Sequence, residues 1–164
     1  MSLFPLVAFY EIEASEADAA LARADHYLGP CDRPFGKQSF GLVVNGELAS
    51  VAVSASTVGS TCGGFNRGEV VELARLGSLP GKRAWTRVAL RCWRELAPSQ
   101  WPHWPVRACV SYSNETRHKG DIYRFDGWTK VAVMPGSTGG GTWTHKQPSE
   151  PKAVWVYDLA RTAA

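Results

Sequence analysis

The chain lacks the features of membrane-bound and secreted proteins. None of its apolar runs approaches the roughly 20 residues that a transmembrane helix needs, and its start, MSLFPLVAFYEIEASEAD, has neither the basic flank nor the cleavage pattern of a signal peptide. A net charge of only +3 does not by itself indicate a nucleic-acid partner, although it permits one if basic residues gather on one face. We expect a protein of a bacterial-type cytoplasm, with no membrane partner.

Patterns typical of metal sites and disulfide frameworks are also missing. The four cysteines, Cys31, Cys62, Cys92 and Cys109, are widely separated and form no C-x-x-C pair. No His-x-x-His or comparable carboxylate spacing points to metal ligands. We therefore expect reduced thiols and no bound metal.

The remaining composition is that of an ordinary globular domain. Apolar residues make up 45% of the sequence, and 164 residues are enough to bury a sizeable core. No internal repeat and no linker-like change of composition divides the chain, and the glycine cluster at 136–141 is better explained as a long hairpin loop. We expect a single domain over residues 1–164.

Alternating strand and helix patterns predict the fold class. Branched and aromatic runs predict strands, whereas an alanine-rich run and an amphipathic run predict two longer helices. The predicted strands are 6–12, 40–44, 47–56, 69–79, 106–113, 128–134 and 152–159, and the predicted helices are 15–25, 85–96 and a short one within HKGDIYRFDGW (118–128). This order indicates an α/β (α+β) protein whose mixed central sheet is flanked by helices on both faces.

Local signals refine this arrangement. Ser15 and Asp18 match a capping box at the start of the first helix. Asn45-Gly46 suits the positive φ values of a type I′ turn and predicts a hairpin. Ser113-Asn114 is placed to cap the short helix.

The stretch EVVELARLGSLPGKRAW places a turn between a strand and an amphipathic helix. Helix N-termini expose unpaired N–H groups that favour phosphate, and Lys82 and Arg83 add positive charge. Neither a Walker loop nor G-x-G-x-x-G is present. The turn is therefore a candidate pyrophosphate site, with ordinary solvated loop charges as the alternative.

Two charged residues, Glu72 and Arg75, lie within one predicted strand. Strand residues three apart point to opposite faces, and a buried charge is costly without a partner. We expect one face to open on a cleft in which Glu72 is a candidate general base, because partial burial raises the pKa of a carboxyl group. A structural ion pair is the alternative.

The segment HKGDIYRFDGW follows an apolar strand and carries Tyr123 four residues before Gly127-Trp128. This order of elements resembles the GNAT acyltransferase superfamily: a strand, a phosphate-favouring turn, a helix, a strand and a short helix. The short helix ends on YRFDGW, and the corresponding ending in the superfamily is Y-x-x-x-G-[FW]. The resemblance covers almost the whole chain. It implies a fold that binds acetyl-CoA where two central parallel strands splay apart, with the pyrophosphate on the turn before the central helix. The superfamily's usual R-x-x-G-x-G/A turn is absent.

A closer resemblance is to the phage Mom family, a GNAT branch that modifies adenine in DNA. The stretches ADHYLG, FGLVVNGEL, VELARLGSLPGKRA, VSYSNETRHKGDIYRFDGW, GGGTWTHKQ and KAVWVY carry it in order and spacing. The H-x-G-x-I-Y of residues 118–123 is nearest to a signature. Where that family tends to have Asn-x-x-Ser after the proline of the turn, this chain has Gly-Lys-Arg-Ala.

These resemblances imply roles for particular residues. Tyr123 occupies the position from which the superfamily donates a proton to the leaving CoA thiolate, with a packing role as the alternative. Asp121 and Glu72 are candidates to accept the amine proton or to orient the acceptor. The candidates for binding acyl-CoA are Leu76, Gly77, Ser78, Gly81, Lys82, Arg83, Ala84 and Asn114, and those for binding the acceptor are His26, Tyr27, Arg75, Ser111 and His118. Read without the resemblance, a His-Tyr pair such as His26-Tyr27 is more often a packing element.

Three functions follow as hypotheses. The first is an acyl-CoA-dependent transferase of the Mom-like GNAT type acting on an amine, most specifically adenine in DNA. The second is a GNAT enzyme that acetylates a small-molecule or protein amine, and the third is a catalytically inactive GNAT-like binding module. A DNA substrate requires basic residues clustered at the mouth of the cleft. The candidates are Lys37, Arg67, Arg117, Lys119, Arg124 and Lys130.

Overall fold

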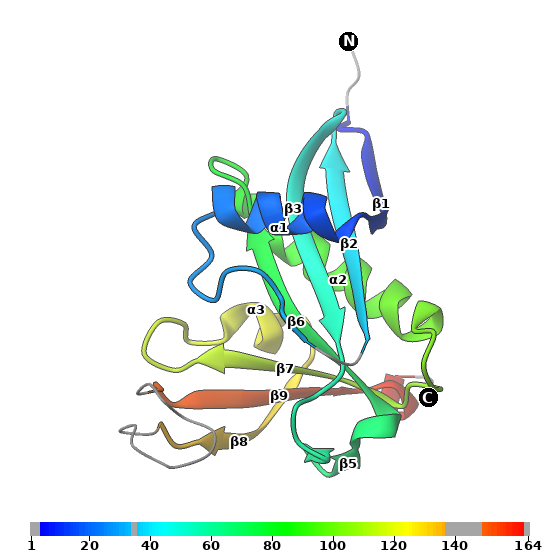
Figure 1. Cartoon of the computed structure of the whole chain (residues 1–164), viewed down its shortest axis with the longest axis vertical. Coiled ribbons are helices and arrows are strands. Elements are labelled where there is room, and N and C mark those ends of the chain that lie inside the picture. Colours follow the sequence, from blue (N-terminus) through cyan, green and yellow to red (C-terminus); the bar gives the residue numbers. More distant parts are fainter. Residues whose placement is uncertain (1–3, 34–35, 137–148, 163–164) are drawn as a thin grey trace.

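The computed structural model describes residues 4–33, 36–136 and 149–162, and seven of its strands form one mixed sheet (Figure 1). The strands are β1 (Val7–Ile12), β2 (Lys37–Val44), β3 (Glu47–Ala55), β6 (Val70–Ser78), β7 (Ala108–Asn114), β8 (Thr129–Met134) and β9 (Lys152–Asp158). Their order across the sheet is β1-β2-β3-β6-β7-β9-β8. Among the described strands of this sheet, β6 and β7 pair in parallel and all other neighbours are antiparallel. The prediction of a mixed central sheet is confirmed.

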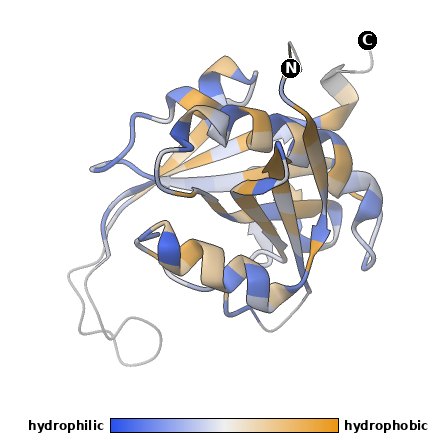
Figure 2. Ribbon diagram, turned by 90° about the horizontal axis from the view of Figure 1, so that it is seen from above, coloured by the Kyte–Doolittle hydropathy of each residue, from blue (hydrophilic) through white to orange (hydrophobic). Residues whose placement is uncertain are grey.

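Helices cover both faces of the sheet. The α-helices are α1 (Ala14–Arg23), α2 (Thr86–Gln100) and α3 (Asp121–Phe125). The apolar side of α1 buries Leu21 against β3 and β6, and α2 buries Leu90 and Trp93 on the opposite face. The indole N–H of Trp93 donates to the hydroxyl of Ser54 at 2.8 Å, so this buried polar group is satisfied. Seen from above, the apolar colours concentrate in the strands between the helices (Figure 2).

The hairpin predicted at Asn45-Gly46 is confirmed, because these residues have φ values of 52° and 84° and join β2 to β3. The capping box is wrong. The first helix begins at Ala14 after Glu13, and no side chain caps it by a hydrogen bond. The cap predicted for the short helix is also wrong, since Gly120 precedes α3 and the carbonyl oxygen of the Asn114 side chain accepts from the backbone N–H of Thr116.

One further segment was not predicted, and another cannot be compared with its prediction. A small hairpin of β4 (Thr61–Cys62) and β5 (Phe65–Asn66) forms within the glycine-rich connection and was not predicted. The glycine cluster and the motif GGGTWTHKQ lie mostly outside the described residues. No helix in the described part of the chain is long and apolar enough to cross a membrane.

The sheet divides between β6 and β7. These strands pair from Val70–Ala108 to Leu73–Ser111, and beyond that point β6 pairs only with β3 while β7 pairs only with β9. The two groups of strands run in clearly different directions in Figure 1. The facing edges of residues 74–78 and 112–114 therefore lack a partner strand, and they carry backbone groups that a ligand can use.

A β-bulge lies at the same place on β6. On β3, Val53 is opposite Arg75 and Ser54 is opposite Leu73, so Ala74 is an extra residue. An extra residue reverses the alternation of side chains along the strand. Glu72 and Arg75 consequently both contact the loop after α1, and the prediction that they point to opposite faces is wrong.

Candidate active site

The Tyr123 side chain lies against the last paired residues of β6 and β7. Its hydroxyl oxygen is 2.9 Å from the hydroxyl oxygen of Ser111, which itself donates to the backbone carbonyl of Leu73 at 3.1 Å. Because the single proton of Ser111 is used by Leu73, the Tyr123 hydroxyl donates to Ser111. Burial raises the pKa of Tyr123 to about 12, so it is a neutral proton donor at neutral pH.

Close packing positions this tyrosine. The ring of Tyr123 stacks on that of Trp155 at 5.5 Å and meets the ring of Trp128 edge-on at 5.4 Å. Gly120, at φ 72°, lets the chain pass close to Trp155, since a Cβ atom there would lie 2.2 Å from the indole. The glycine of the H-x-G-x-I-Y segment is thus required for the position of Tyr123.

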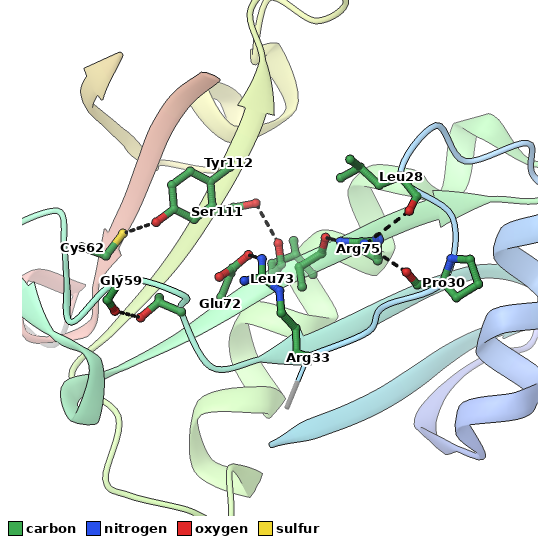
Figure 3. Close-up of polar contacts among 12 residues, drawn as sticks. Leu28, Pro30, Arg33, Gly59, Cys62, Glu72, Leu73, Arg75, Ser111 and Tyr112 are labelled. Carbon is green, nitrogen blue, oxygen red and sulfur yellow. Dashed lines mark hydrogen bonds and ion pairs between the residues drawn. The ribbon is translucent and has the colours of Figure 1, made fainter. Parts of the chain in front are cut away.

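Glu72 lies on the other face of the sheet. Its Oε1 accepts from Nη2 of Arg33 at 2.8 Å, and its side chain is 3% exposed (Figure 3). Burial raises the pKa of Glu72 to about 7, although the positive charges of Arg33, Arg75 and Lys152 oppose this rise. A carboxyl group with a pKa near 7 is suited to accept a proton at neutral pH.

A second tyrosine shares this face with Glu72. Ser111 and Tyr112 are neighbours in β7, so their side chains point to opposite faces. The Tyr112 hydroxyl lies 3.0 Å from the sulfur of Cys62 (Figure 3), and burial raises the pKa values of both groups. Two tyrosines therefore occupy the two faces of the sheet at the end of the parallel pair.

Arg75, a candidate for binding the acceptor, fastens a loop to the sheet. Its guanidinium donates to the carbonyls of Gly29 at 2.9 Å and Pro30 at 3.0 Å, and also to those of Leu28 and Ala74 (Figure 3). These contacts fasten the segment between α1 and β2 to β6. The same loop carries Arg33, the ion-pair partner of Glu72.

Aromatic and basic side chains gather near the end of β6. His26 stacks on Tyr27 with ring centres 5.4 Å apart. The ring of His118 is tilted relative to that of Tyr27, with ring centres 6.4 Å apart. The guanidinium of Arg117 lies 5.1 Å above the Tyr27 ring. Burial, with the positive charge of Arg75, lowers the pKa of His26 to about 4, so this imidazole is neutral at pH 7. The structure brings together His26, Tyr27 and His118, three of the candidates for binding the acceptor.

The turn after β6 leads into α2. Gly81 has φ 75°, and within the described residues the backbone N–H groups of Gly81, Arg83 and Ala84 donate no hydrogen bond to the chain. Such N–H groups at a helix start suit an anion. The ammonium of Lys82 is 2.9 Å from the carboxylate of Glu47, so its charge is already compensated.

The end of β6 is tied to this turn. The Ser78 hydroxyl lies 2.6 Å from the hydroxyl of Thr86, the first residue of α2, and 3.1 Å from that of Ser50. Ser50 also donates to the backbone carbonyl of Gly77 at 2.8 Å. The backbone of Leu76, Gly77 and Ser78 is thus held against β3 while its other edge faces the splay.

Two candidate residues are placed away from this centre. The carboxylate of Asp121 is about half exposed and pairs with Arg124 at 3.3 Å. The buried side-chain amide of Asn114 is used to bind Thr116 and Glu150, which fastens the turn after β7. The structure does not join either side chain to the Tyr123–Ser111 pair.

Sequence reasoning missed Arg33 and Tyr112 as site residues. Arg33 lies in a proline-containing loop with no periodicity, and its partner Glu72 is 39 positions away. Tyr112 reads as an ordinary aromatic residue of a strand, and Cys62 is 50 positions away. The buried charge of Glu72 was the one available signal, because it requires a cationic partner.

Comparisons with known proteins agree with this geometry. No family model and no curated protein matches the chain. Solved structures do match, among them a GNAT family acetyltransferase from Elizabethkingia anophelis with acetyl-CoA bound, with a TM-score of 0.57 and 11% identity over 93% of this chain and 98% of that one. The chain has the GNAT acyltransferase fold.

Two other solved structures, whose names specify N-acetyltransferases, also match the chain. The ribosomal-protein-S18-alanine N-acetyltransferase from Escherichia coli has a TM-score of 0.62 and 11% identity, covering 94% of both chains. A spermidine N-acetyltransferase chimera from Vibrio cholerae and hSSAT has a TM-score of 0.65 and 6% identity over 96% of this chain and 98% of that one. At these identities the comparisons show the fold alone, and they do not support the narrower resemblance to the phage Mom family.

Proposed function

We propose that this chain is an acyl-CoA-dependent N-acyltransferase of the GNAT type, which uses acetyl-CoA or a related acyl-CoA to acylate an amine of a small molecule or a protein. The observation that carries the proposal is the placement of Tyr123 and Glu72 on the two faces of the last β6–β7 pair. The names of the E. coli and spermidine enzymes, which specify amine acceptors, support the same class of reaction.

The donor would lie along the open edges of the splay. The unpaired edge of residues 74–78 suits the amides of a pantetheine chain, and the free N–H groups of Gly81, Arg83 and Ala84 suit a pyrophosphate. Arg83 adds a positive charge to this turn. These residues fit an acyl-CoA, although the superfamily's glycine-rich turn is absent.

The chemistry assigned to the chain is a balanced exchange. The amine nitrogen forms a bond to the thioester carbonyl carbon and loses one proton, which Glu72 accepts. The carbon–sulfur bond breaks, and Tyr123 donates its hydroxyl proton to the departing sulfur. Proton exchange with solvent then restores both side chains, so the products are an amide and the free thiol of CoA.

The first experiment measures CoA binding and acyl transfer directly. Isothermal titration calorimetry with CoA should show binding that weakens in Lys82→Ala/Arg83→Ala, because charge-assisted contacts contribute about 1.5–3 kcal/mol each. We expect Arg83 to contribute more than Lys82, because Lys82 is already paired with Glu47. The absence of any CoA binding would leave only a GNAT-shaped binding module.

Adenine in DNA is the second candidate acceptor. The Mom-like segments support it, as does the aromatic group of Tyr27, His26 and His118, which suits a base drawn out of the stack. Most of the basic residues expected at the mouth of the cleft give less support to a DNA acceptor. Lys37, Arg117, Arg124 and Lys130 each lie within 4 Å of a carboxylate, and Arg67 donates to backbone carbonyls.

A single measurement separates the two acceptors. Mass spectrometry of nucleosides from the DNA of cells that express the protein should reveal a new adenine adduct if DNA is the substrate. Salt-dependent DNA binding should accompany it. An unmodified nucleoside profile, together with acyl transfer to free amines in vitro, would assign the small-molecule or protein acceptor.

A further inference from the structure

The carboxylate of Asp126, at the end of the short helix α3, is bound by three side chains. Its Oδ2 accepts from Nε of Arg94 at 2.8 Å and from the indole N–H of Trp128 at 3.0 Å. Its Oδ1 accepts from Nε of Arg91 at 3.1 Å. Both oxygens are therefore in use. We call Arg91, Arg94, Asp126 and Trp128 the Asp126 network.

The central ion pair of this network is a weak source of stability. The side chains of Arg94 and Asp126 are 9% and 5% exposed, so both charges have lost most of their hydration. The attraction within such a pair often does no more than offset this loss, and apolar side chains of similar volume can replace it. A role in fixing the position of a neighbouring group accounts for the pair better than stability does.

The group that the Asp126 network fixes is the buried indole of Trp128. The rings of Trp128 and Tyr123 meet edge-on, with centres 5.4 Å apart. The backbone N–H groups of Asp126 and Trp128 both donate to the carbonyl of Tyr123, at 3.1 Å and 3.0 Å. The ring and the backbone of Tyr123 are thus both in contact with residues of the network.

The other indole that contacts the Tyr123 ring, that of Trp155, is anchored as well. Its N–H donates to the hydroxyl of Ser113 at 2.9 Å. The two anchors come from different elements, because Ser113 lies in β7 and both arginines of the Asp126 network lie in α2. A shift of either indole changes the place of the Tyr123 hydroxyl relative to Ser111. Misplacing a catalytic group by about 1 Å can cost about a hundredfold in rate.

We propose that Asp126 is a positioning residue for the proton donor Tyr123, an inference that rests on the proposed function. The carboxylate, held by Arg94, orients the indole of Trp128. This indole holds the Tyr123 ring where its hydroxyl meets the departing sulfur. Asp126 itself neither gives nor takes a proton in the reaction.

The decisive variant replaces the buried ion pair by apolar side chains of similar size. Arg94→Met/Asp126→Leu leaves no unpaired buried charge, so the protein should fold, but Trp128 loses its acceptor. We expect kcat to fall about tenfold or more while KM for acyl-CoA is unchanged, because the position of Tyr123 matters only when the proton is transferred.

Two single variants test the same step with less change to the ion pair. Trp128→Phe leaves the ion pair intact and keeps an aromatic ring, but this ring cannot bind Asp126, so kcat should fall in the same way. It decides the question if the double variant does not fold. Asp126→Asn is the rescue variant, because its amide oxygen can replace Oδ2 and its amide nitrogen displaces only the exposed Arg91. Its kcat should stay close to that of the unaltered protein.

Ser54→Ala is the matched control. It deletes the acceptor of another buried indole N–H, that of Trp93, whose ring stacks on Trp128 at 6.4 Å. The loss of a buried hydrogen bond should lower the urea midpoint of unfolding, whereas kcat should be unchanged.

Nuclear magnetic resonance reports the geometry without acyl transfer. In protein labelled with ¹⁵N and ¹³C, Trp128→Phe and Tyr123→Phe identify the indole N–H resonance of Trp128 and the Cζ resonance of Tyr123. Both resonances should shift in Arg94→Met/Asp126→Leu. The Tyr123 resonance should not shift in Asp126→Asn or in Ser54→Ala.

Three results would overturn the proposal. They are an unshifted Tyr123 resonance in the folded double variant, full kcat in Trp128→Phe, and a loss of kcat in Ser54→Ala as large as in the double variant. Failure of the proposed function gives a different signature. In that case the unaltered protein transfers no acyl group from acetyl-CoA or another acyl-CoA to an amine, while the shift of the Tyr123 resonance is still measured.

Discussion

The two faces of the sheet at the splay differ in how their polar atoms are used. On the Tyr123 face, the hydroxyls of Tyr123 and Ser111 and the indole N–H of Trp155 all have partners within the chain. On the Glu72 face, one carboxylate oxygen and one guanidinium nitrogen have none in the described residues. The polar atoms of the Tyr123 face hold its side chains in position, whereas the Glu72 face leaves two buried polar atoms unpaired within the described chain.

The largest expected effect follows from removing the hydroxyl on the satisfied face. Tyr123→Phe keeps the ring packed on Trp155 and deletes the proton donor, so turnover should fall about a hundredfold or more. Initial-rate assays of acyl transfer measure the turnover. Thermal unfolding and CoA affinity are the controls and should change little. Near-full turnover would make Tyr123 part of the scaffold and remove the catalytic half of the comparison.

On the open face, Glu72→Gln should change how stability depends on pH. The pKa of Glu72 in the folded protein, about 7, lies above the ordinary 4.5, so the folded state holds this proton more tightly than the unfolded state. The contribution of Glu72 is therefore fully present below pH 4.5 and is lost as the pH rises to 7, by up to about 3 kcal/mol. Urea denaturation of the unaltered protein and of Glu72→Gln at pH 5 and pH 8 measures this change in the free energy of unfolding.

Glu69 is the matched carboxyl group, and its pKa shift has the opposite sign to that of Glu72. Hydrogen bonds from Asn66 and Arg107 lower the pKa of Glu69, so its stabilising contribution is present above its ordinary pKa and is lost as the pH falls. Glu69→Gln should therefore destabilise the protein at pH 5 and pH 8 alike, and less at pH 3, because the lowered pKa keeps Glu69 ionised at pH 5. Equal pH profiles for the Glu72 and Glu69 variants would contradict the difference in burial between them.

Packing on the satisfied face is tested at Gly120. A Cβ atom there would lie 2.2 Å from the indole of Trp155, and the residue has φ 72°, so Gly120→Ala should destabilise the protein by about 1–3 kcal/mol. Gly64→Ala is the control, with φ 89° and no atom within 4 Å of the added carbon. It should cost less, from backbone strain alone. Equal losses in the two variants would mean that the face is not tightly packed.

The smallest effect is expected from the second tyrosine. Tyr112→Phe deletes a hydroxyl whose partner is the sulfur of Cys62, a weak hydrogen-bond acceptor. The cost should stay below about 1 kcal/mol, and turnover should change only a few-fold. Chemical denaturation and the acyl-transfer assay are run beside Tyr123→Phe. A hundredfold loss for Tyr112→Phe would place the proton donor on the wrong face.

Much of the fold could be predicted because its signals are local. Asn45 and Gly46 adopt the positive φ values that a two-residue hairpin needs, whatever surrounds them. The seven strands of the sheet follow from runs of branched and aromatic residues. The predicted N-cap of the first helix, Ser15, lies two residues after the observed N-cap, Glu13, and helix ends are the least certain part of such a prediction.

The candidate site could be predicted only in part. Tyr123 was found from the motif that ends on Gly127-Trp128, and Glu72 from the cost of a charge within a strand. The face to which the Arg75 side chain points was predicted wrongly, because the bulge at Ala74 reverses the alternation of side chains. No residue type in β6 indicates this bulge.

The sequence by itself determined the order of strands and helices and the hairpin turn, because each depends on the intrinsic preferences of a few neighbouring residues. The tertiary structure alone decided that Arg33 meets Glu72, that Tyr112 meets Cys62, and that one face keeps open polar atoms. These contacts join residues 39 and 50 positions apart. They exist because the sheet and the loop after α1 bring distant segments within hydrogen-bonding range, which local preference does not encode.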